Sequence, residues 1–254
     1  MAINGKKVVA VITGRMTSSR LPGKIMMPLQ GKPVMAHMIE RHRRSTYTDE
    51  VVVATTTNAA DDAVVALCEK MQCPYFRGSE ADVLGRVVGA SLEHTADILV
   101  QGMADSPLVD WRIVDALVAM LEEGAFDVTS NEFGDEKYPD GFDMRVYRFD
   151  VLRKFEEDHK EEACREHVGY ELRNDPLQYK RGLLLAKGDM LRLKLRLTLD
   201  TKEDYELISA VYDELYPKNP DFSAEDVVAF LKDRPELVVI NAAIEQKAPP
   251  SPNQ

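Results

Sequence analysis

The sequence lacks the long apolar runs and the cysteine pattern that mark several classes of protein. No stretch approaches the about 18 apolar residues needed to cross a bilayer, so we expect no membrane span. The N-terminal MAINGKK has neither the apolar stretch nor the cleavage site of a signal peptide. The three cysteines, Cys68, Cys73 and Cys164, show no metal-ligand spacing. We therefore expect free thiols and a cytoplasmic location.

Basic residues are also too few for a typical nucleic-acid-binding protein. The chain has 32 Lys and Arg against 43 Asp and Glu, and its net charge of −11 would repel a phosphate backbone. We therefore predict that nucleic acid is not a partner. The basic residues do cluster near the N-terminus, where they indicate a cationic pocket for a small polyanion. They are Arg15, Arg20, Lys24, Lys32, Arg41, Arg43 and Arg44.

The first half of the sequence alternates strand and helix patterns. A β-branched apolar run at 7–13 ends at a glycine, as buried strands do. Further strands are predicted at 50–55, 74–76, 97–101 and 127–130, and helices at 33–44, 59–71, 82–94 and 111–122. The alternation predicts an α/β fold with an open, mostly parallel sheet flanked by helices. Ligands bind such sheets beyond the carboxyl ends of the strands, so the loops 14–24, 55–58 and 102–110 should share one rim.

The second half is less regular. The letters YPDG at 138–141 signal a turn before an alternating segment. Helices are predicted at 150–157, 161–173, 202–216 and 224–231, and a strand-rich stretch at 181–198. The polar, proline-rich residues 246–254 predict a disordered tail.

The loop predicted to follow the first strand carries the clearest chemical signal. Its sequence at 14–24, GRMTSSRLPGK, contains two glycines, three hydroxyl residues and three cations. A loop that wraps a triphosphate needs close backbone N–H groups, hydroxyl donors and fixed positive charge. The spacing fits neither the Walker A loop nor the dinucleotide-binding fingerprint. From composition alone, an ordinary solvated basic loop explains the segment equally well.

Residues 15–24 resemble the R-x-x-S-x-R-L-P-G-K signature of the cytidylyltransferases. This family includes the CMP-3-deoxy-octulosonate synthetases and the spore-coat polysaccharide biosynthesis proteins of the F type. Segments similar to the spore-coat type follow in the same order at 31–33, 49–57, 76–80, 82–86, 105–108, 138–141, 165–168 and 197–201. The resemblance therefore extends over roughly 15–205, most of the chain.

The resemblance implies a Rossmann-like nucleotidyltransferase fold with a smaller mixed β insertion. Residues 1–245 would form a single domain, with a nucleotide-binding half at about 1–130 and an acceptor-binding and dimerisation half at about 131–245. The implied activity is that of a Mg²⁺-dependent enzyme transferring CMP from CTP to a small-molecule acceptor, with release of pyrophosphate. The acceptor would be a sugar, a sugar acid or a phosphorylated compound used in surface polysaccharide biosynthesis. A homodimer is also implied, as in the lipopolysaccharide synthetases of this group.

The resemblance also implies site residues. Arg15, Arg20 and Lys24 would act in catalysis by stabilising charge on the leaving pyrophosphate. Asp105 and Asp200 would bind Mg²⁺, which prefers oxygen ligands. The candidates for nucleotide binding are Thr13, Gly14, Ser18, Ser19, Thr55, Thr56 and Arg86. The candidates for acceptor binding are Tyr138, Asp140, Glu166 and His167.

Ordinary structural roles compete with several of these assignments. Asp105 could cap the turn before Pro107, and Asp200 could be the N-cap of the helix predicted from 202. Arg86 could belong to a plain helix start, and Glu166 and His167 could be a surface or core pair. The sequence also departs from the family pattern at Ala104, where relatives have a glycine.

The sequence also leaves other functional classes open. A nucleotide-sugar-dependent glycosyltransferase would use a related sheet and a metal, although the usual D-x-D motif is not found at 61–62 or 105–107. A nucleotidyltransferase with a different base or a non-sugar acceptor is another alternative. A catalytically silent binding protein would have lost the metal pair, whereas both aspartates are present here.

Overall fold

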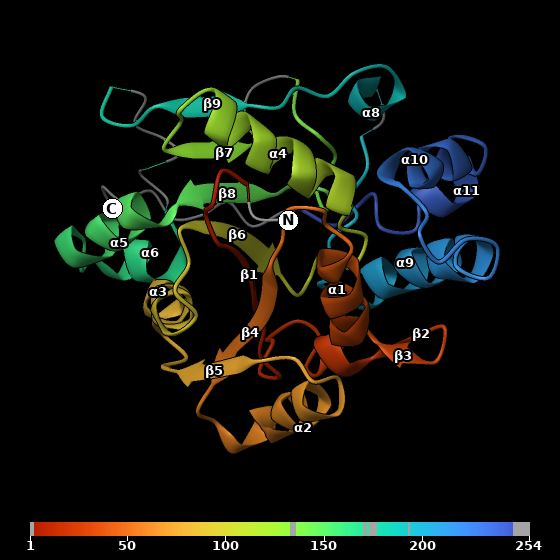
Figure 1. Ribbon diagram of the computed structural model, residues 1–254. Helices are drawn as coiled ribbons and strands as arrows, with labels where there is room; N and C mark the ends of the chain where they lie inside the picture. Colours follow the sequence, from red (N-terminus) through yellow and green to blue (C-terminus); the bar gives the residue numbers. More distant parts are fainter. Residues whose placement is uncertain (1–2, 133–135, 170–171, 173–176, 193, 246–254) are drawn as a thin grey trace.

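A single seven-stranded sheet runs through the molecule (Figure 1). The structure is a computed structural model that describes residues 3–132, 136–169, 172, 177–192 and 194–245. The strands are β1 (Val8–Thr13), β4 (Glu50–Thr56), β5 (Tyr75–Gly78), β6 (Ile98–Met103), β7 (Val128–Ser130), β8 (Arg145–Arg148) and β9 (Arg181–Leu183). Their order across the sheet is β5-β4-β1-β6-β8-β7-β9. Only β8 is antiparallel to its neighbours, and β2 (Pro28–Leu29) and β3 (Lys32–Pro33) form a small separate hairpin.

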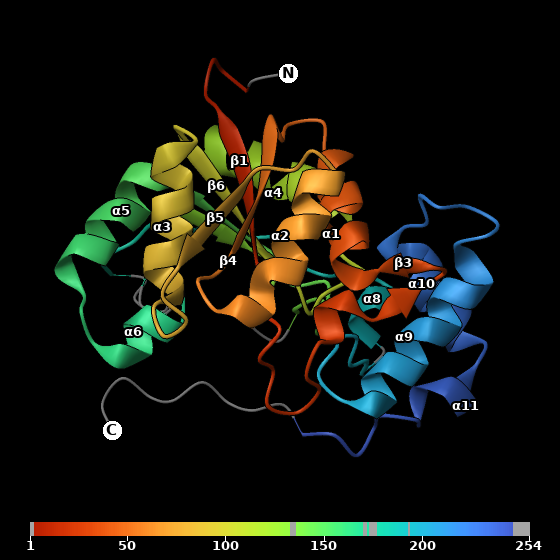
Figure 2. The ribbon, with the colours of Figure 1, turned by 90° about the horizontal axis from the view of Figure 1, so that it is seen from below.

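Helices cover both faces of the sheet (Figures 1 and 2). On one face lie α1 (Val34–Arg43), α2 (Asp62–Lys70), α4 (Trp111–Glu123), α9 (Lys202–Leu215) and α10 (Ala224–Lys232). On the other face lie α3 (Val83–Glu93), α5 (Phe149–Asp158) and α6 (Glu162–Glu166). The short elements are η1 (Lys24–Met26), η2 (Ala59–Asp61), α8 (Asp189–Arg192) and α11 (Pro235–Val238). This arrangement confirms the predicted α/β class.

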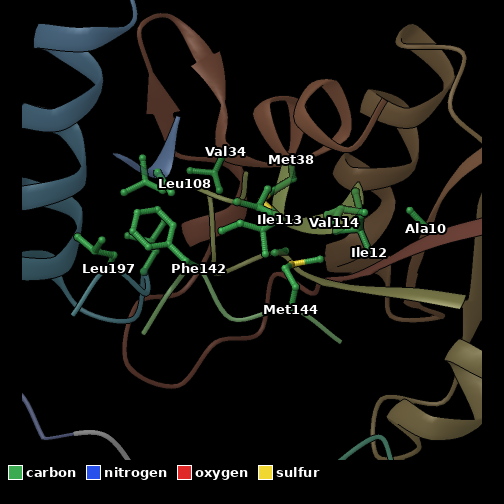
Figure 3. Packing of buried hydrophobic residues seen from close by; sticks show 14 of the residues in the cluster. Ala10, Ile12, Val34, Met38, Leu108, Ile113, Val114, Phe142, Met144 and Leu197 are labelled. Carbon is green, nitrogen blue, oxygen red and sulfur yellow. The ribbon is translucent and has the colours of Figure 1, made fainter. Parts of the chain in front are cut away.

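The strands are apolar on both sides because each side faces a hydrophobic core. In β1, Val8, Ala10 and Ile12 point into the larger core. Val9 and Val11 point into the smaller one, which α3, α5 and α6 cover. Successive side chains of a strand point to opposite faces of the sheet. A strand is therefore apolar at every position only when both faces are buried. Figure 3 shows the larger core, in which Ile12, Met38 and Val114 come together from a strand and two helices.

Two elements of the second half differ from prediction. The helix expected over 161–173 ends at Glu166, because His167 has extended backbone angles (φ −109°, ψ 93°). Residues 170–171 and 173–176 lie outside the described part of the chain, as does the tail predicted at 246–254. In the strand-rich stretch expected over 181–198, the described residues contain one strand, β9, followed by α8 and an isolated bridge at Arg196. The neighbouring strand β7 ends at Ser130, and its pairing with β9 ends at Leu183.

Among the described residues, every helix is too short or too polar to cross a bilayer.

Candidate active site

The loops that follow the parallel strands gather at one edge of the sheet. The loop after β1 projects at the lower edge of Figure 2, and the loops after β4, β5 and β6 end at the same rim because these strands run parallel. The shared rim predicted from the sequence is therefore present. It brings the cationic loop 14–24 close to residues far along the chain.

The centre of this rim is an ion cluster formed by Lys24, Asp105 and Asp200. The Nζ atom of Lys24 lies 2.8 Å from Oδ1 of Asp200 and 3.5 Å from Oδ2 of Asp105. The side chains of Lys24 and Asp200 are only 11% and 9% exposed, whereas that of Asp105 is 34% exposed. Asp105 and Asp200 lie 81 and 176 positions after Lys24 in the sequence. Three distant segments of the chain therefore meet at one point.

Asp200 carries most of the ion pairing in this cluster. Its Oδ2 atom lies 2.9 Å from an Nη2 atom of Arg20 and 2.9 Å from the Nη2 atom of Arg196. Burial opposes ionisation of the carboxyl. The surrounding positive charges, with Lys24 first, outweigh burial and hold the pKa of Asp200 below its ordinary value. Asp200 is therefore a carboxylate compensated by three cations.

Backbone hydrogen bonds place Asp200 beside Asp105. The N–H of Leu199 donates to the carbonyl of Asp105 at 2.7 Å, and the N–H of Leu197 donates to the carbonyl of Asp140 at 2.7 Å. Gly141 allows this close approach, since a Cβ atom there would lie 2.5 Å from the backbone of Leu197, and its φ is +105°. We call residues 197–200 the strap, because they cross the ends of the strands between Asp140 and Asp105.

Neither Asp105 nor Asp200 acts as a helix cap. The N-cap of α9 is Thr201, which forms a capping box with Asp204, so the alternative of Asp200 as the N-cap is wrong. Asp204 also accepts a hydrogen bond from the backbone N–H of Asp200 at 2.9 Å and forms an ion pair with Arg196. The Oδ1 atom of Asp105 is buried and has no hydrogen-bond partner among the residues that the structure describes. A buried carboxylate oxygen without a donor is incompletely satisfied by the protein alone.

The donor set of Asp105 and Asp200 fits a magnesium ion. Mg²⁺ takes oxygen ligands and usually binds through one or two carboxylates together with water and substrate phosphates. The unpartnered Oδ1 of Asp105 supplies one such oxygen. Among the described residues, no group of three or more His, Cys, Asp or Glu side chains is placed to hold a metal by itself. A two-carboxylate site of the magnesium type is the arrangement that these residues can form.

The outer half of the cationic loop is tied to Glu80, which follows β5. Arg15 Nη1 lies 3.4 Å from Oε1 of Glu80, and the hydroxyl of Thr17 donates to the same carboxylate. Asn58 Nδ2 donates to its other oxygen at 2.6 Å. The hydrogen bonds from Thr17 and then Asn58 lower the pKa of Glu80. Glu80 is not among the predicted site residues, because the residues around it match only a weak family segment.

The predicted nucleotide-binding residues fall into an exposed and a buried group. Ser18 and Ser19 lie on the projecting part of the loop, and Ser19 is exposed. Thr55 and Thr56 are fully buried at the end of β4, so neither side chain lies on the open rim. Thr13 is half-buried, and its hydroxyl donates to the carbonyl of Gly102 at 3.3 Å.

Gly14 and Arg86, two further candidates for nucleotide binding, are both closely surrounded by other residues. A Cβ atom at Gly14 would lie 2.9 Å from the methyl of Ala104. The methyl of Ala104 thus packs in the larger core against Gly14. Arg86 is 3% exposed and donates to the carbonyls of Ser79 and Glu80 at 2.5 and 3.0 Å, while its Nε has no partner in the structure.

The four predicted acceptor-binding residues do not form one cluster. Tyr138 packs against the larger core, and burial raises its pKa. Asp140 pairs with Lys137 at 2.9 Å. Glu166 is exposed and His167 half-buried at the end of α6, a helix whose Cys164 belongs to the smaller core. These residues therefore flank the rim at different places.

A second polar cluster, missed in the sequence, lies where β6, β7 and β8 meet. Arg145 Nε donates to Glu132 at 2.7 Å, and its Nη2 contacts the same carboxylate. Its Nη1 contacts the sulfur of Met103 at 3.3 Å, and Asp143 lies 3.8 Å from Nη2. A thioether is a weak acceptor, so this guanidinium retains donor capacity towards the rim. The alternation of 142–146 predicted a strand but gave no indication of this pairing.

An open, mostly parallel sheet with a cationic loop after its first strand and two carboxylates at the carboxyl edge defines the class of nucleotide-binding α/β enzymes. The sequence pattern of the family described as Cytidylyltransferase matches residues 9–233. The chain therefore belongs to the cytidylyltransferases, a family of nucleotidyltransferase enzymes.

Individual relatives agree with this placement. The spore coat polysaccharide biosynthesis protein SpsF of Bacillus subtilis is 31% identical over 246 residues, which cover 95% of this chain and 98% of that protein. A 3-deoxy-manno-octulosonate cytidylyltransferase of Syntrophobacter fumaroxidans is 34% identical over 122 residues, which cover 46% of this chain and 47% of that protein. The solved structure of a cytidylyltransferase from Leptospira borgpetersenii superimposes with a TM-score of 0.86 at 29% identity, covering 95% of this chain and all of that one.

Proposed function

We propose that this protein is a Mg²⁺-dependent cytidylyltransferase that transfers CMP from CTP to an oxygen atom of a small acceptor and releases pyrophosphate. The observation that carries the proposal is the meeting of Lys24 with Asp105 and Asp200 at the carboxyl edge of the sheet. In this proposal Lys24 would be a phosphate-binding cation next to two carboxylates that would supply oxygen ligands for a metal. Membership of the family favours nucleotidyl transfer over glycosyl transfer.

The residues of the rim would divide the work of the reaction. The acceptor oxygen forms a bond to the α-phosphorus while the bond from that phosphorus to the bridging oxygen of the pyrophosphate breaks. Negative charge then grows on the leaving pyrophosphate. Arg15, Arg20 and Lys24 carry fixed positive charge on the loop that would surround it, and such preorganised charge stabilises the transition state.

Asp105 and Asp200 would hold the metal in this scheme. When bound, Mg²⁺ supplies positive charge that polarises phosphate oxygens and favours attack by the acceptor oxygen. Lys24 and Arg20, which pair with Asp200 without ligand, would exchange this carboxylate for triphosphate oxygens.

The acceptor side of the proposal is broader. A sugar, a sugar acid or a phosphorylated compound for surface polysaccharides is supported by the similarity to SpsF and, over about half the chain, to an octulosonate cytidylyltransferase. Arg145 and Glu132, together with the predicted Tyr138, Asp140, Glu166 and His167, are the groups that we propose for its recognition. A different base or a non-sugar acceptor remains the alternative. Homodimer formation and a cytoplasmic location are further parts of the proposal, which rest on the family resemblance and on the small number and spacing of the cysteines.

The decisive experiment measures pyrophosphate release. The protein is incubated with each nucleoside triphosphate, Mg²⁺ and a panel of sugar acids, sugar phosphates and neutral polyols. We expect release with CTP and one acceptor class, and a mass spectrum showing a CMP-linked product. Asp105→Asn should lower kcat by at least about 100-fold, because one charged oxygen ligand is lost. Asp213→Asn, on the exposed side of α9, is the control and should retain turnover.

Two results would reject the proposal. One is the absence of pyrophosphate with every pair, together with transfer from a nucleotide sugar. The other is full Mg²⁺-dependent turnover in Asp105→Asn.

A further inference from the structure

The buried carboxylate of Asp61, at the end of η2, is hydrogen-bonded to the backbone of the cationic loop. Asp61 is 0% exposed. Its Oδ1 atom accepts the backbone N–H of Met16 at 2.7 Å. Its Oδ2 atom accepts the backbone N–H of Thr56 at 3.1 Å and also the hydroxyl of Thr56. Hydrogen bonds to an ionised acceptor are about twice as strong as those between neutral groups, so Asp61 joins the loop firmly to the end of β4.

Met16 is the point at which the loop closes on itself. Its N–H is held by Asp61, and its carbonyl accepts the N–H of Gly23 at 2.9 Å. These two bonds form a neck from which residues 17–22 project. Arg15 and Lys24 are the immediate chain neighbours of the two neck residues. A displacement of Met16 would therefore move both of these cations relative to the sheet.

We propose that Asp61 is a positioning residue for triphosphate binding. By fixing the neck to β4, it sets Arg15 and Lys24 in place before the ligand arrives, so less ordering is needed on binding. Preorganisation of this kind raises affinity without a contact to the ligand. The inference rests on the proposed function for the identity of the ligand, whereas the role of Asp61 at the neck stands on the hydrogen bonds alone.

Asparagine cannot reproduce what Asp61 does. The carboxylate accepts on both oxygens, whereas an amide has one oxygen and presents N–H donors on its other side. In Asp61→Asn, the amide nitrogen would face either the N–H of Met16 or the N–H of Thr56, leaving one buried donor unpaired. The adjacent Asp62 makes a matched control, because its side chain is 65% exposed and pairs with Arg77 on the surface.

The experiment compares Asp61→Asn with Asp62→Asn by two measurements. Calorimetry gives the Kd of CTP with Mg²⁺ and without acceptor, and hydrogen exchange reports the protection of the Met16 amide. For Asp61→Asn we expect a Kd raised by at least about fivefold and a comparable loss of protection, because an unpaired buried donor is costly. Asp62→Asn should match the wild type in both. Thr56→Val removes one of the three donors to Asp61 and also the acceptor of the Asn58 N–H. It should raise the Kd by about threefold and serves if Asp61→Asn does not fold.

A purely structural role predicts a different pattern. In that case Asp61→Asn would lower the Tm while the folded protein kept wild-type CTP affinity and Met16 protection, and the proposal would be overturned. If the wild-type protein binds no triphosphate, the proposed function fails instead. Hydrogen exchange at Met16 then still decides whether Asp61 fixes the neck.

Discussion

A bound metal would compete with Lys24 for its two carboxylates, whereas a bound triphosphate would offer Lys24 a new anionic partner. Without ligand, its ammonium lies 2.8 Å from Asp200 and 3.5 Å from Asp105, the two carboxylates that we propose as metal ligands. A cation in this position competes with a divalent metal for the same oxygens. A triphosphate would offer Lys24 another anionic partner. Binding of the nucleotide should therefore strengthen binding of the metal.

Replacement of Lys24 should separate metal binding from turnover. In Lys24→Met, the competing charge is removed while the long side chain is retained, so Mn²⁺ without nucleotide should bind at least about fivefold more tightly. Turnover should fall by about 100-fold, because charge on the pyrophosphate is less well stabilised. Titration of Mn²⁺ by electron paramagnetic resonance tests the first effect. Lys32→Met, which loses a pair with Glu40, is the control; unchanged or weaker Mn²⁺ binding in Lys24→Met contradicts the competition.

The contiguous motif and the family resemblance singled out residues whose side chains the structure brings together, while their roles stay a prediction. Lys24 and Arg20 belong to one such motif, and Asp200 lies beside them as the family resemblance implied. Asp61 could not be recognised in this way. It stands beside Asp62 in the same apparent helix start, and only the fold buries the first and exposes the second. The partners of a buried side chain come from distant segments, which local patterns do not reveal.

At the scale of elements, the strap 197–200 decides where one of the metal candidates lies. It has few strand contacts of its own and is held by the hydrogen bonds from Leu197 to Asp140 and from Leu199 to Asp105. Its place next to Gly141 depends on the missing side chain there, since a Cβ would lie 2.5 Å from both the carbonyl carbon and the oxygen of Leu197.

Gly141→Ala should therefore disturb stability and metal binding together. We expect a loss of at least about 2 kcal/mol in the free energy of unfolding, because alanine adds both backbone strain at positive φ and a clash with rigid backbone. The strap should shift, and the Kd for Mg²⁺ in the presence of CTP should rise. Gly188→Ala is a matched control, since its φ is also positive (+59°) but a Cβ would have nothing within 4 Å. Equal effects of the two substitutions in calorimetric unfolding would show that the approach to Leu197 is unimportant.

Prediction of whole elements succeeded where apolar residues recur with a clear period. The strand at β1 and the helix at α9 were both predicted nearly to their ends, because one is apolar on both faces and the other has a regular buried stripe. The stretch 181–198 was wrongly predicted as strand-rich. Ala186, Met190 and Leu195 are buried there, but they reach the larger core from irregular chain and a short helix. Burial alone does not specify a strand, because side chains on irregular chain and on a short helix can reach the core as well.

At the scale of the whole molecule, the ion cluster joins the two halves of the chain. Arg20 and Lys24 come from the loop after β1, whereas Asp200 and Arg196 come from the segment before α9. The sheet also crosses this division, because β8 pairs with β6 and β7. The carboxylate of Asp200 is only 9% exposed, so its loss would remove the anion that three cations share, with little solvent to replace it. The cluster should therefore contribute to global stability as well as to the site.

The sign of the pH dependence follows from the lowered pKa of Asp200. A carboxyl whose pKa is lower in the folded state stabilises the fold fully above its unfolded pKa of about 4 and loses this contribution as the pH falls through the folded value. Asp200→Asn removes the titrating group. At neutral pH, with EDTA present, this variant should be about 3 kcal/mol less stable than the wild type.

This difference should shrink steadily as the pH falls below about 4, because protonation then removes the same charge from the wild type. Urea unfolding across a range of about five pH units, from pH 2.5 to 7.5, measures it. Asp233→Asn, at an exposed position, should remain close to the wild type throughout. A gap between wild type and Asp200→Asn that stays constant down to the lowest pH would mean that the lost stability comes from packing of the side chain. A gap that closes would identify the negative charge of Asp200 as the link between the two halves.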